Sequence, residues 1–256
     1  MILIDTHAHL DMLKKSTPAE AVDMAAKWGV RFIINVGSSL EASKKASEIS
    51  TEFKNVYASA GIHPHYAKGY GQQEEKTLLG LIEGNKKLVA IGETGFDYYR
   101  NLSTKEDQLR AFESHIKIAL EYNLPLIVHD REAHDDTLDV LKKYHKKEDF
   151  KAVLHCFSGD SQFAKEVLKL GIYISFTGVL TFPNAEKTVE AAKTIPLNKI
   201  FLETDAPFLA PQSKRGKENQ PAYCTYIAEK LALIKNISVE EVAQKTTENA
   251  LNFFGI

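Results

Sequence analysis

The chain contains little cysteine and no long apolar run. Its 256 residues include only two cysteines, Cys156 and Cys224, too few for the disulfide framework of a small secreted domain. We expect both to be buried, reduced thiols. No apolar run approaches the ~18 residues that a membrane-spanning helix needs. Residues 1–15 also lack the basic region, apolar run and cleavage site of a secretory signal, so the sequence predicts a cytoplasmic protein.

An excess of charge of either sign is also lacking. The formal net charge is −2, from 32 Lys and Arg against 34 Asp and Glu, so nothing marks the whole surface as one that binds nucleic acid or anionic membranes. A polyanionic partner would have to be held by a local patch or by metal ions. With 44% hydrophobic and 26% charged residues, the chain has enough apolar content to fill a large globular core.

Short apolar runs alternate with longer amphipathic segments along the chain. The runs are apolar on both faces, which is typical of parallel strands covered on each side. There are eight of them, at residues 2–6, 31–36, 56–62, 88–92, 124–128, 152–154, 172–176 and 200–203. Eight strands alternating with helices indicate either a closed (β/α)8 barrel or an open doubly wound sheet. The length suits a single-domain barrel over residues 1–256.

Capping patterns predict helices between these runs. Thr17, followed by Pro18 and by Glu20 three positions on, forms a capping box with proline at the first helical position. Gly29 is a suitable helix stop before the second run. Further helices are predicted to begin with a capping box at Ser103, to span 160–170, and to run from Ser238 to about Phe254.

Side chains of the types that bind metals follow several of the runs, at the point where each ends. His7 and His9 are two residues apart, so an extended chain points both to the same side. The others are Glu93, His129, His155 and Asp205. Barrel enzymes place their catalytic groups at these strand ends, and imidazoles there would be costly to bury without partners. We therefore favour the closed barrel and predict a divalent-metal site from the six residues together.

The remaining histidines give weaker signals. His115 and His145 lie on segments that we interpret as helical and solvent-facing, so we expect them at the surface. His65 and His134 are more consistent with structural roles, or with contacts to a ligand side chain, than with ligation. Asp5 is predicted either to orient a ligand imidazole or to make hydrogen bonds at the end of its strand.

Seven segments in order carry a family pattern. They are IDTHAHLD (4–11), GIHPH (61–65), GETGFDYYR (92–100), HDREA (129–133), HCFSG (155–159), ETDAPFLAP (203–211) and RGKENQPAY (215–223). Together they resemble the TatD family of metal-dependent deoxyribonucleases, within the amidohydrolase-like barrel superfamily. The resemblance extends from residue 4 to Glu248-Asn249-Ala250. Thr94 and Phe96 depart from the usual pattern, which leaves every ligand in place but predicts an altered pocket wall at Phe96.

The resemblance implies a 3′→5′ exonuclease that prefers single-stranded DNA, and some members have been linked to D-aminoacyl-tRNA deacylation. By motif position, His7 and His9 would share one ion with Asp205. His129 and His155 would hold a second ion, and Glu93 would bridge the two. The family is usually described as magnesium-dependent, whereas four imidazoles suit zinc, manganese, cobalt or iron better. We therefore expect two divalent ions per chain, with Mg²⁺ or Mn²⁺ in turnover and Zn²⁺ as a further bound species.

Two such ions, about 3.5–4 Å apart, can activate a water and clamp the scissile group. Glu93 and Asp205 are the predicted catalytic carboxylates, with Asp205 orienting the water and taking its proton. His63 is predicted to contact the phosphate or protonate the leaving oxygen, or else to order the loop before Pro64.

For substrate binding we predict Arg131, Arg215 and Lys217, because each follows a strand end and can contact phosphates of a DNA substrate. Arg131 has an alternative as an ion-pair partner of Glu132 or Glu203. The aromatic residues that follow strand ends are candidates for stacking on unpaired bases, or else for packing of the loop layer; they are Tyr98, Tyr99, Phe157 and Phe208. We predict no membrane contact and no obligate protein partner.

These residues leave three hypotheses about activity. The first is a nuclease that acts on DNA ends. The second is an amide or ester hydrolase of the same fold, such as a D-aminoacyl-tRNA deacylase. The third is a metal-binding protein without activity, against which the complete ligand pattern argues. Glu93 favours the nuclease over barrels that bridge their metals with a modified lysine.

Overall fold

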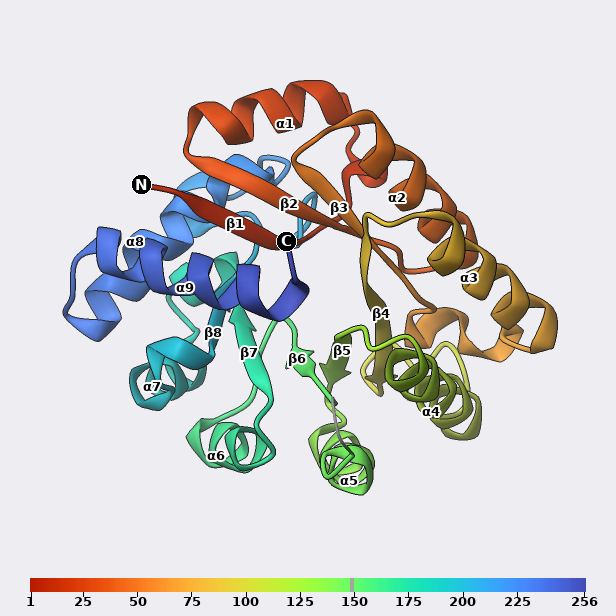
Figure 1. The fold of residues 1–256 in the computed structure, drawn as a ribbon. Coiled ribbons are helices and arrows are strands. Elements are labelled where there is room, and N and C mark those ends of the chain that lie inside the picture. Colours follow the sequence, from red (N-terminus) through yellow and green to blue (C-terminus); the bar gives the residue numbers. More distant parts are fainter. Residues whose placement is uncertain (148–149) are drawn as a thin grey trace.

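The computed structural model describes residues 1–147 and 150–256. Eight parallel strands pair in chain order and curve into a barrel, with helices around the outside (Figure 1). The strands are β1 Leu3–Ala8, β2 Val30–Val36, β3 Val56–Ala60, β4 Leu88–Asp97, β5 Leu126–Arg131, β6 Ala152–Leu154, β7 Tyr173–Phe176 and β8 Ile200–Leu202. The predicted barrel is confirmed, and all eight predicted runs contribute a strand.

Helices cover the outer face of the sheet. They are α1 Pro18–Lys27, α2 Leu40–Glu52, α3 Gln72–Gly84, α4 Lys105–Glu121, α5 His134–Tyr144, α6 Ser161–Lys169, α7 Glu186–Thr194, α8 Cys224–Lys235 and α9 Val239–Phe254. No helix in the described part of the chain is long and apolar enough to cross a membrane.

The predicted helix starts are confirmed with one correction. Thr17 and Glu20 make the reciprocal bonds of a capping box, and Gly29 follows α1 with φ +85°. Helix α4 is capped by Thr104 rather than Ser103, because the Thr104 side chain accepts from the backbone N–H of Asp107. The Ser103 hydroxyl instead donates to a backbone carbonyl in the loop after β3.

The barrel closes where β1 meets the segment after β8. The His9 N–H donates to the Ala206 carbonyl at 2.7 Å, and the Asp205 N–H donates to the His7 carbonyl at 2.8 Å. These bonds are made at the carboxyl ends of the strands. Closure of the barrel therefore places His7, His9 and Asp205 next to one another.

Strand β4 continues five residues beyond its predicted end at residue 92. The extension pairs with β5, with Gly95 opposite His129 and Asp97 opposite Arg131. Gly95 has φ +140°, and a Cβ there would lie 2.1 Å from the His129 carbonyl oxygen. Only glycine allows this approach, so Gly95 lets the ladder continue past Glu93.

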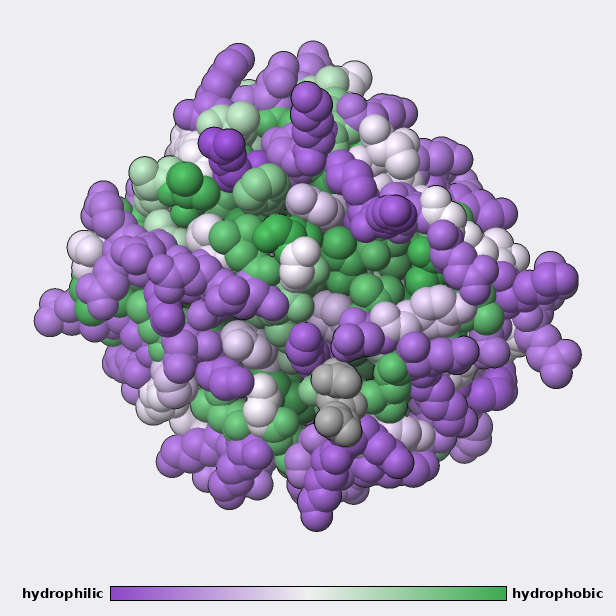
Figure 2. Space-filling model, in the orientation of Figure 1, coloured by the Kyte–Doolittle hydropathy of each residue, from purple (hydrophilic) through white to green (hydrophobic). Residues whose placement is uncertain are grey.

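The amino-terminal end of the barrel is filled by apolar side chains. Ile4, Ile34, Val153 and Phe201 pack there against residues of α9, including Phe253. Helix α9 lies across this end in Figure 1, and Figure 2 shows apolar residues gathered around its carboxyl end. The opposite end of the barrel carries the polar strand ends and opens to a cavity.

Candidate metal centre

All six predicted metal ligands meet at the carboxyl-terminal edge of the barrel. Their side chains are mostly buried, and even the more accessible His129 and Asp205 expose only 16% and 15% of theirs. They lie in or directly after the strands: His7 and His9 at β1, Glu93 in β4, His129 in β5, His155 after β6 and Asp205 after β8. The sequence prediction that these residues lie together is confirmed.

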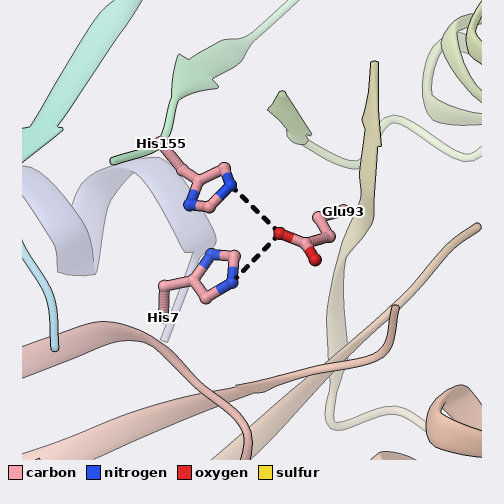
Figure 3. A group of neighbouring side chains, drawn as sticks. All are labelled: His7, Glu93 and His155. Carbon is pink, nitrogen blue, oxygen red and sulfur yellow. Dashed lines mark ion pairs between the residues drawn. The ribbon is translucent and has the colours of Figure 1, made fainter. Parts of the chain in front are cut away.

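The Glu93 carboxylate is at the middle of the cluster. Its Oε2 lies 3.0 Å from His155 Nε2 and 3.3 Å from His7 Nε2, so two imidazoles approach one oxygen (Figure 3). The rings of His7 and His155 stack with centroids 4.1 Å apart. His129 Nδ1 is 3.1 Å from His155 Nε2 and 3.9 Å from the same Glu93 oxygen.

Two further groups flank this core on opposite sides. On one side, His9 Nε2 is 3.3 Å from His7 Nε2 and 3.5 Å from Asp205 Oδ1. On the other side, His63 Nε2 faces Glu93 Oε1 at 3.8 Å. His63 Nδ1 accepts the N–H of His65 at 3.1 Å, so the histidine both orders its loop and faces the cluster. Loop ordering is one of the two alternatives that the sequence offered for His63; the other, a contact with the phosphate or the leaving oxygen, stays a prediction.

The donors fit a divalent metal. His7 Nε2 lies 3.3 Å from His9 Nε2, and His129 Nδ1 lies 3.1 Å from His155 Nε2. When both rings of a pair are neutral, at most one of the two nitrogens can donate a hydrogen bond to the other. Imidazole and carboxylate groups that converge in a largely buried cluster are expensive to leave without partners. Subsets such as His7, His9 and Asp205 place three ligand atoms within 4.8 Å of one another, which is the arrangement a cation satisfies.

The far nitrogens of three imidazoles face acceptors, and those of His9 and His129 lie at hydrogen-bond distance from them. His9 Nδ1 is 2.8 Å from the Val36 carbonyl. His129 Nε2 is 3.2 Å from Asp97 Oδ2, and His155 Nδ1 lies 3.5 Å from Glu203 Oε1. A proton held toward these acceptors leaves the other nitrogen of each ring with a free lone pair toward the cluster.

Asp97 and Glu203 contact proposed ligands in a way that the sequence did not predict. Both are buried, at 1% exposure each. Asp97 also accepts from His65 at 3.0 Å, and neighbouring imidazoles hold its pKa below the ordinary value although burial raises it. The signal for Asp97 was present in the GETGFDYYR segment, but a strand expected to end at residue 92 placed it in a loop.

Burial and neighbouring charges shift the pKa values of Glu93 and His155 in opposite directions. Burial alone would raise the pKa of Glu93, but the imidazoles of His63, His155 and His7 hold it well below its usual range. Burial would likewise lower the pKa of His155, which Glu203 and Glu93 raise well above its ordinary value. The carboxylate therefore stays ionised and available as a ligand.

Asp5 and the remaining histidines occupy positions set by hydrogen bonds. Asp5 accepts from the backbone N–H groups of Thr204 and His7 at 2.8 and 3.3 Å, so it makes strand-end hydrogen bonds rather than orienting an imidazole. The expectation that His115 lies at the surface is wrong: it is fully buried, with both ring nitrogens hydrogen-bonded to backbone groups. His134 contacts Asp130 at 2.5 Å, and His145 is partly exposed after α5.

The two cysteines are free thiols. Cys224 is buried as expected, whereas Cys156 is only partly buried and lines the cavity. Phe96 packs against Phe112 with ring centroids 5.4 Å apart and is not among the side chains that line the cavity.

A cavity of about 630 Å³ opens above the cluster. Arg131 lines it together with Glu93, His129 and Asp205, whereas Arg215 and Lys217 are not among its lining residues. Arg215 instead lies over the Phe182 ring, with its Cζ 4.7 Å from the centroid. The lining also includes exposed or partly exposed groups that suit a large substrate, namely Met12, Tyr66, Arg100, Phe208 and Leu209.

A parallel barrel with histidines and carboxylates converging at its carboxyl-terminal edge defines a class of protein, the metal-dependent hydrolases built on the α/β barrel. Comparisons with known proteins give the same class. The family model described as TatD related DNase matches residues 4–255. The metal-dependent hydrolase YcfH of Escherichia coli K12 is 42% identical over 260 residues, which cover 100% of this chain and 97% of YcfH.

Two more similarities extend the comparison. The 3'-5' ssDNA/RNA exonuclease TatD of Escherichia fergusonii is 33% identical over 242 residues, covering 93% of this chain and 92% of that protein. The crystal structure of YJJV, a TatD homolog from Escherichia coli k12, matches with a TM-score of 0.92 and 29% identity, covering 99% of this chain and 98% of that chain. The chain belongs to the TatD family and is a metal-dependent hydrolase.

Proposed function

We propose that the protein is a deoxyribonuclease that removes nucleotides from the 3′ end of single-stranded DNA with the aid of two divalent ions. One observation carries the proposal: imidazoles from several strand ends converge on the buried Glu93 carboxylate beneath an open cavity. The relative named a 3'-5' ssDNA/RNA exonuclease supports the choice of substrate.

The proposed ligands divide into two groups that share Glu93. His7, His9 and Asp205 would hold one ion, and His129 and His155 the other. Bound divalent ions supply Lewis-acid chemistry, since they polarise a phosphoryl oxygen and lower the pKa of a water ligand from 15.7 to about 7. Mg²⁺ or Mn²⁺ is proposed for turnover, and the imidazole-rich donors also suit Zn²⁺.

Chain residues would perform the remaining tasks. Asp205 is accessible from the cavity and would accept a proton from the attacking water. Because His63 Nδ1 accepts the His65 N–H, a neutral ring carries its proton on Nε2, on the side of Glu93. We assign this N–H to a hydrogen bond with an oxygen of the scissile phosphate. Arg131, Arg215 and Lys217 are proposed to contact other phosphates of the strand.

The proposal is tested by offering two substrates to the same preparation. End-labelled single-stranded DNA and a transfer RNA charged with a D-amino acid are each incubated with Mg²⁺, Mn²⁺ or Zn²⁺. We expect shortening of the DNA from its 3′ end, with no comparable release of amino acid. Release of the amino acid from an intact transfer RNA, with no DNA shortening, would replace the nuclease with an ester hydrolase.

The Arg215→Ala and Lys217→Ala double variant is expected to bind single-stranded DNA more weakly and with a shallower salt dependence. For every phosphate that the protein no longer neutralises, the slope of log K against log salt falls by about 0.7. The measurement is a binding titration at several salt concentrations. A matched control replaces Lys27 and Arg31, which are exposed at the opposite end of the barrel. Equal slopes in both double variants would remove residues 215 and 217 from the binding surface.

A further inference from the structure

Two arginines line the cavity beside the proposed metal centre, and their side chains are not part of the cluster. We infer that Arg100 and Arg131, both packed against Tyr99, form a binding site for a phosphate that neighbours the scissile one in the substrate strand. The inference rests on the proposed nuclease function and adds a requirement to it. The substrate must carry a negative charge on the linkage next to the one that is cut.

The pairing of β4 with β5 places this proposed phosphate site beside the proposed metal centre. Arg131 lies two residues beyond His129 on β5, so both side chains point to the same side of the sheet, about 6.6 Å apart along the strand. Opposite it, Asp97 is the ladder partner of Arg131. Asp97 Oδ1 accepts the Arg100 N–H at 2.7 Å, and its Oδ2 lies 3.2 Å from His129 Nε2. One buried carboxylate therefore fixes both a proposed ligand and the Arg100 turn.

Tyr99 contacts both guanidinium groups. The Cζ of Arg131 lies 4.0 Å from the centroid of the Tyr99 ring, and that of Arg100 lies 5.8 Å away. Stacking on an aromatic face restrains a guanidinium while leaving its N–H edge free to donate. Tyr99 itself is 55% exposed, so the stack stands at the surface where a strand can reach it.

Neither guanidinium has an ion-pair partner among the described residues. Within residues 1–147 and 150–256, no carboxylate lies within 4.0 Å of either guanidinium. Glu203, one of the ion-pair partners that the sequence suggested for Arg131, instead accepts the N–H of Cys156 at 2.7 Å. Guanidinium groups without an acidic partner bind phosphate through paired N–H donors, which makes a phosphate the suitable ligand.

The cavity lining also includes apolar groups. Phe208 is 51% exposed and lines the cavity with Met12 and Leu209. An exposed aromatic ring of this kind stacks on an unpaired base. A cavity with both cationic and apolar lining groups fits a nucleotide unit, which has an anionic phosphate and an apolar base face, better than it fits a simple anion.

The test compares two trinucleotides that differ in one charge. In both, a hydrolysis-resistant phosphorothioate replaces the 3′-terminal linkage. The neighbouring linkage is either an ordinary phosphodiester or a neutral methylphosphonate. Dissociation constants are measured by fluorescence anisotropy at low salt for the wild type, Arg100→Gln, Arg131→Gln and the control Arg31→Gln, whose side chain is exposed at the opposite end of the barrel. Melting temperatures confirm that each variant is folded.

We expect the wild type and Arg31→Gln to bind the phosphodiester strand about tenfold more tightly than the methylphosphonate strand, as for a charge-assisted contact. Arg100→Gln and Arg131→Gln should each remove most of that ratio, and Arg131→Lys should restore part of it. A wild-type ratio near one, or an unchanged ratio in both glutamine variants, would overturn the inference.

The same experiment separates this inference from the proposed function. Because binding is measured with a resistant linkage, the ratio does not depend on turnover. Hydrolysis of an unmodified trinucleotide is followed in parallel. Hydrolysis with a ratio near one would reject the phosphate site and keep the nuclease, whereas the expected ratio without hydrolysis would reject the nuclease and keep the phosphate site.

Discussion

Glu93→Gln is expected to lower turnover by at least ~10³-fold and to reduce the metal content of the protein. Two divalent ions bring four positive charges, and among the proposed ligands only Glu93 and Asp205 are negative, because histidines ligate as neutral imidazoles. Glutamine keeps the size of the side chain but would remove half of the compensating charge, at the position proposed to lie between the ions. Turnover of single-stranded DNA and metal content per chain are the measurements.

A matched control is Glu229→Gln, which changes an exposed carboxylate on α8 in the same way. It should leave both quantities unchanged. Near-normal turnover of Glu93→Gln with two bound ions would refute the bridging role of Glu93.

In the metal-free protein the same substitution is expected to lower stability. His155 has a raised pKa, so its ion pair with Glu93 contributes fully below about pH 6.5 and is lost as the pH rises through the folded-state value. Glu93 has a lowered pKa, so its contribution is present above about pH 4.3 and is lost as the pH falls. The melting temperatures of the two metal-free proteins should therefore differ most between about pH 4.3 and 6.5. Equal melting temperatures throughout would contradict this ion pair.

The fold and the proposed ligands could be predicted from the sequence because both depend on local patterns. Apolar runs mark the strands, and a residue such as His7 needs only its place at the end of a run to be assigned to the active edge of a barrel. The positions that the sequence missed depend on contacts between residues that are far apart in the chain. Asp97 faces His129 only because Gly95 lets β4 continue beside β5.

His115 shows a different limit. The sequence placed it at the surface because its helical segment was interpreted as solvent-facing there, yet it lies on the buried face of α4 with Phe112 and Ile116. Its Nδ1 faces the Ala111 carbonyl at 2.7 Å, and its Nε2 accepts the Ile62 N–H at 3.1 Å. A buried polar side chain is tolerated where its hydrogen bonds are made, and the partner at Ile62 is not visible from the helix pattern. The sequence also did not single out Arg100, which lines the cavity.

Removal of divalent ions with a chelator is expected to abolish hydrolysis while the protein stays folded. The proposed ligands lie at one end of the barrel, whereas the other end is filled by apolar side chains packed against α9, including Phe253. Loss of a bound ligand lowers stability by RT ln(1 + [L]/Kd), so the melting temperature should fall without unfolding at room temperature. The measurements are DNA turnover and far-ultraviolet circular dichroism before and after dialysis.

Addition of Mn²⁺ should restore activity, and a sample dialysed without chelator is the control. Full activity after exhaustive dialysis would show that the chemistry needs no metal. Loss of helical signal on dialysis would instead make the ions part of the folded core.

The most direct test of the two-ion centre is the position of bound metal in a crystal of the protein grown with Mn²⁺, located by anomalous scattering. Two peaks per chain are expected on either side of the Glu93 carboxylate, one beside His7, His9 and Asp205 and the other beside His129 and His155. Peaks away from these side chains, or a cluster without any peak at saturating Mn²⁺, would contradict the proposed centre.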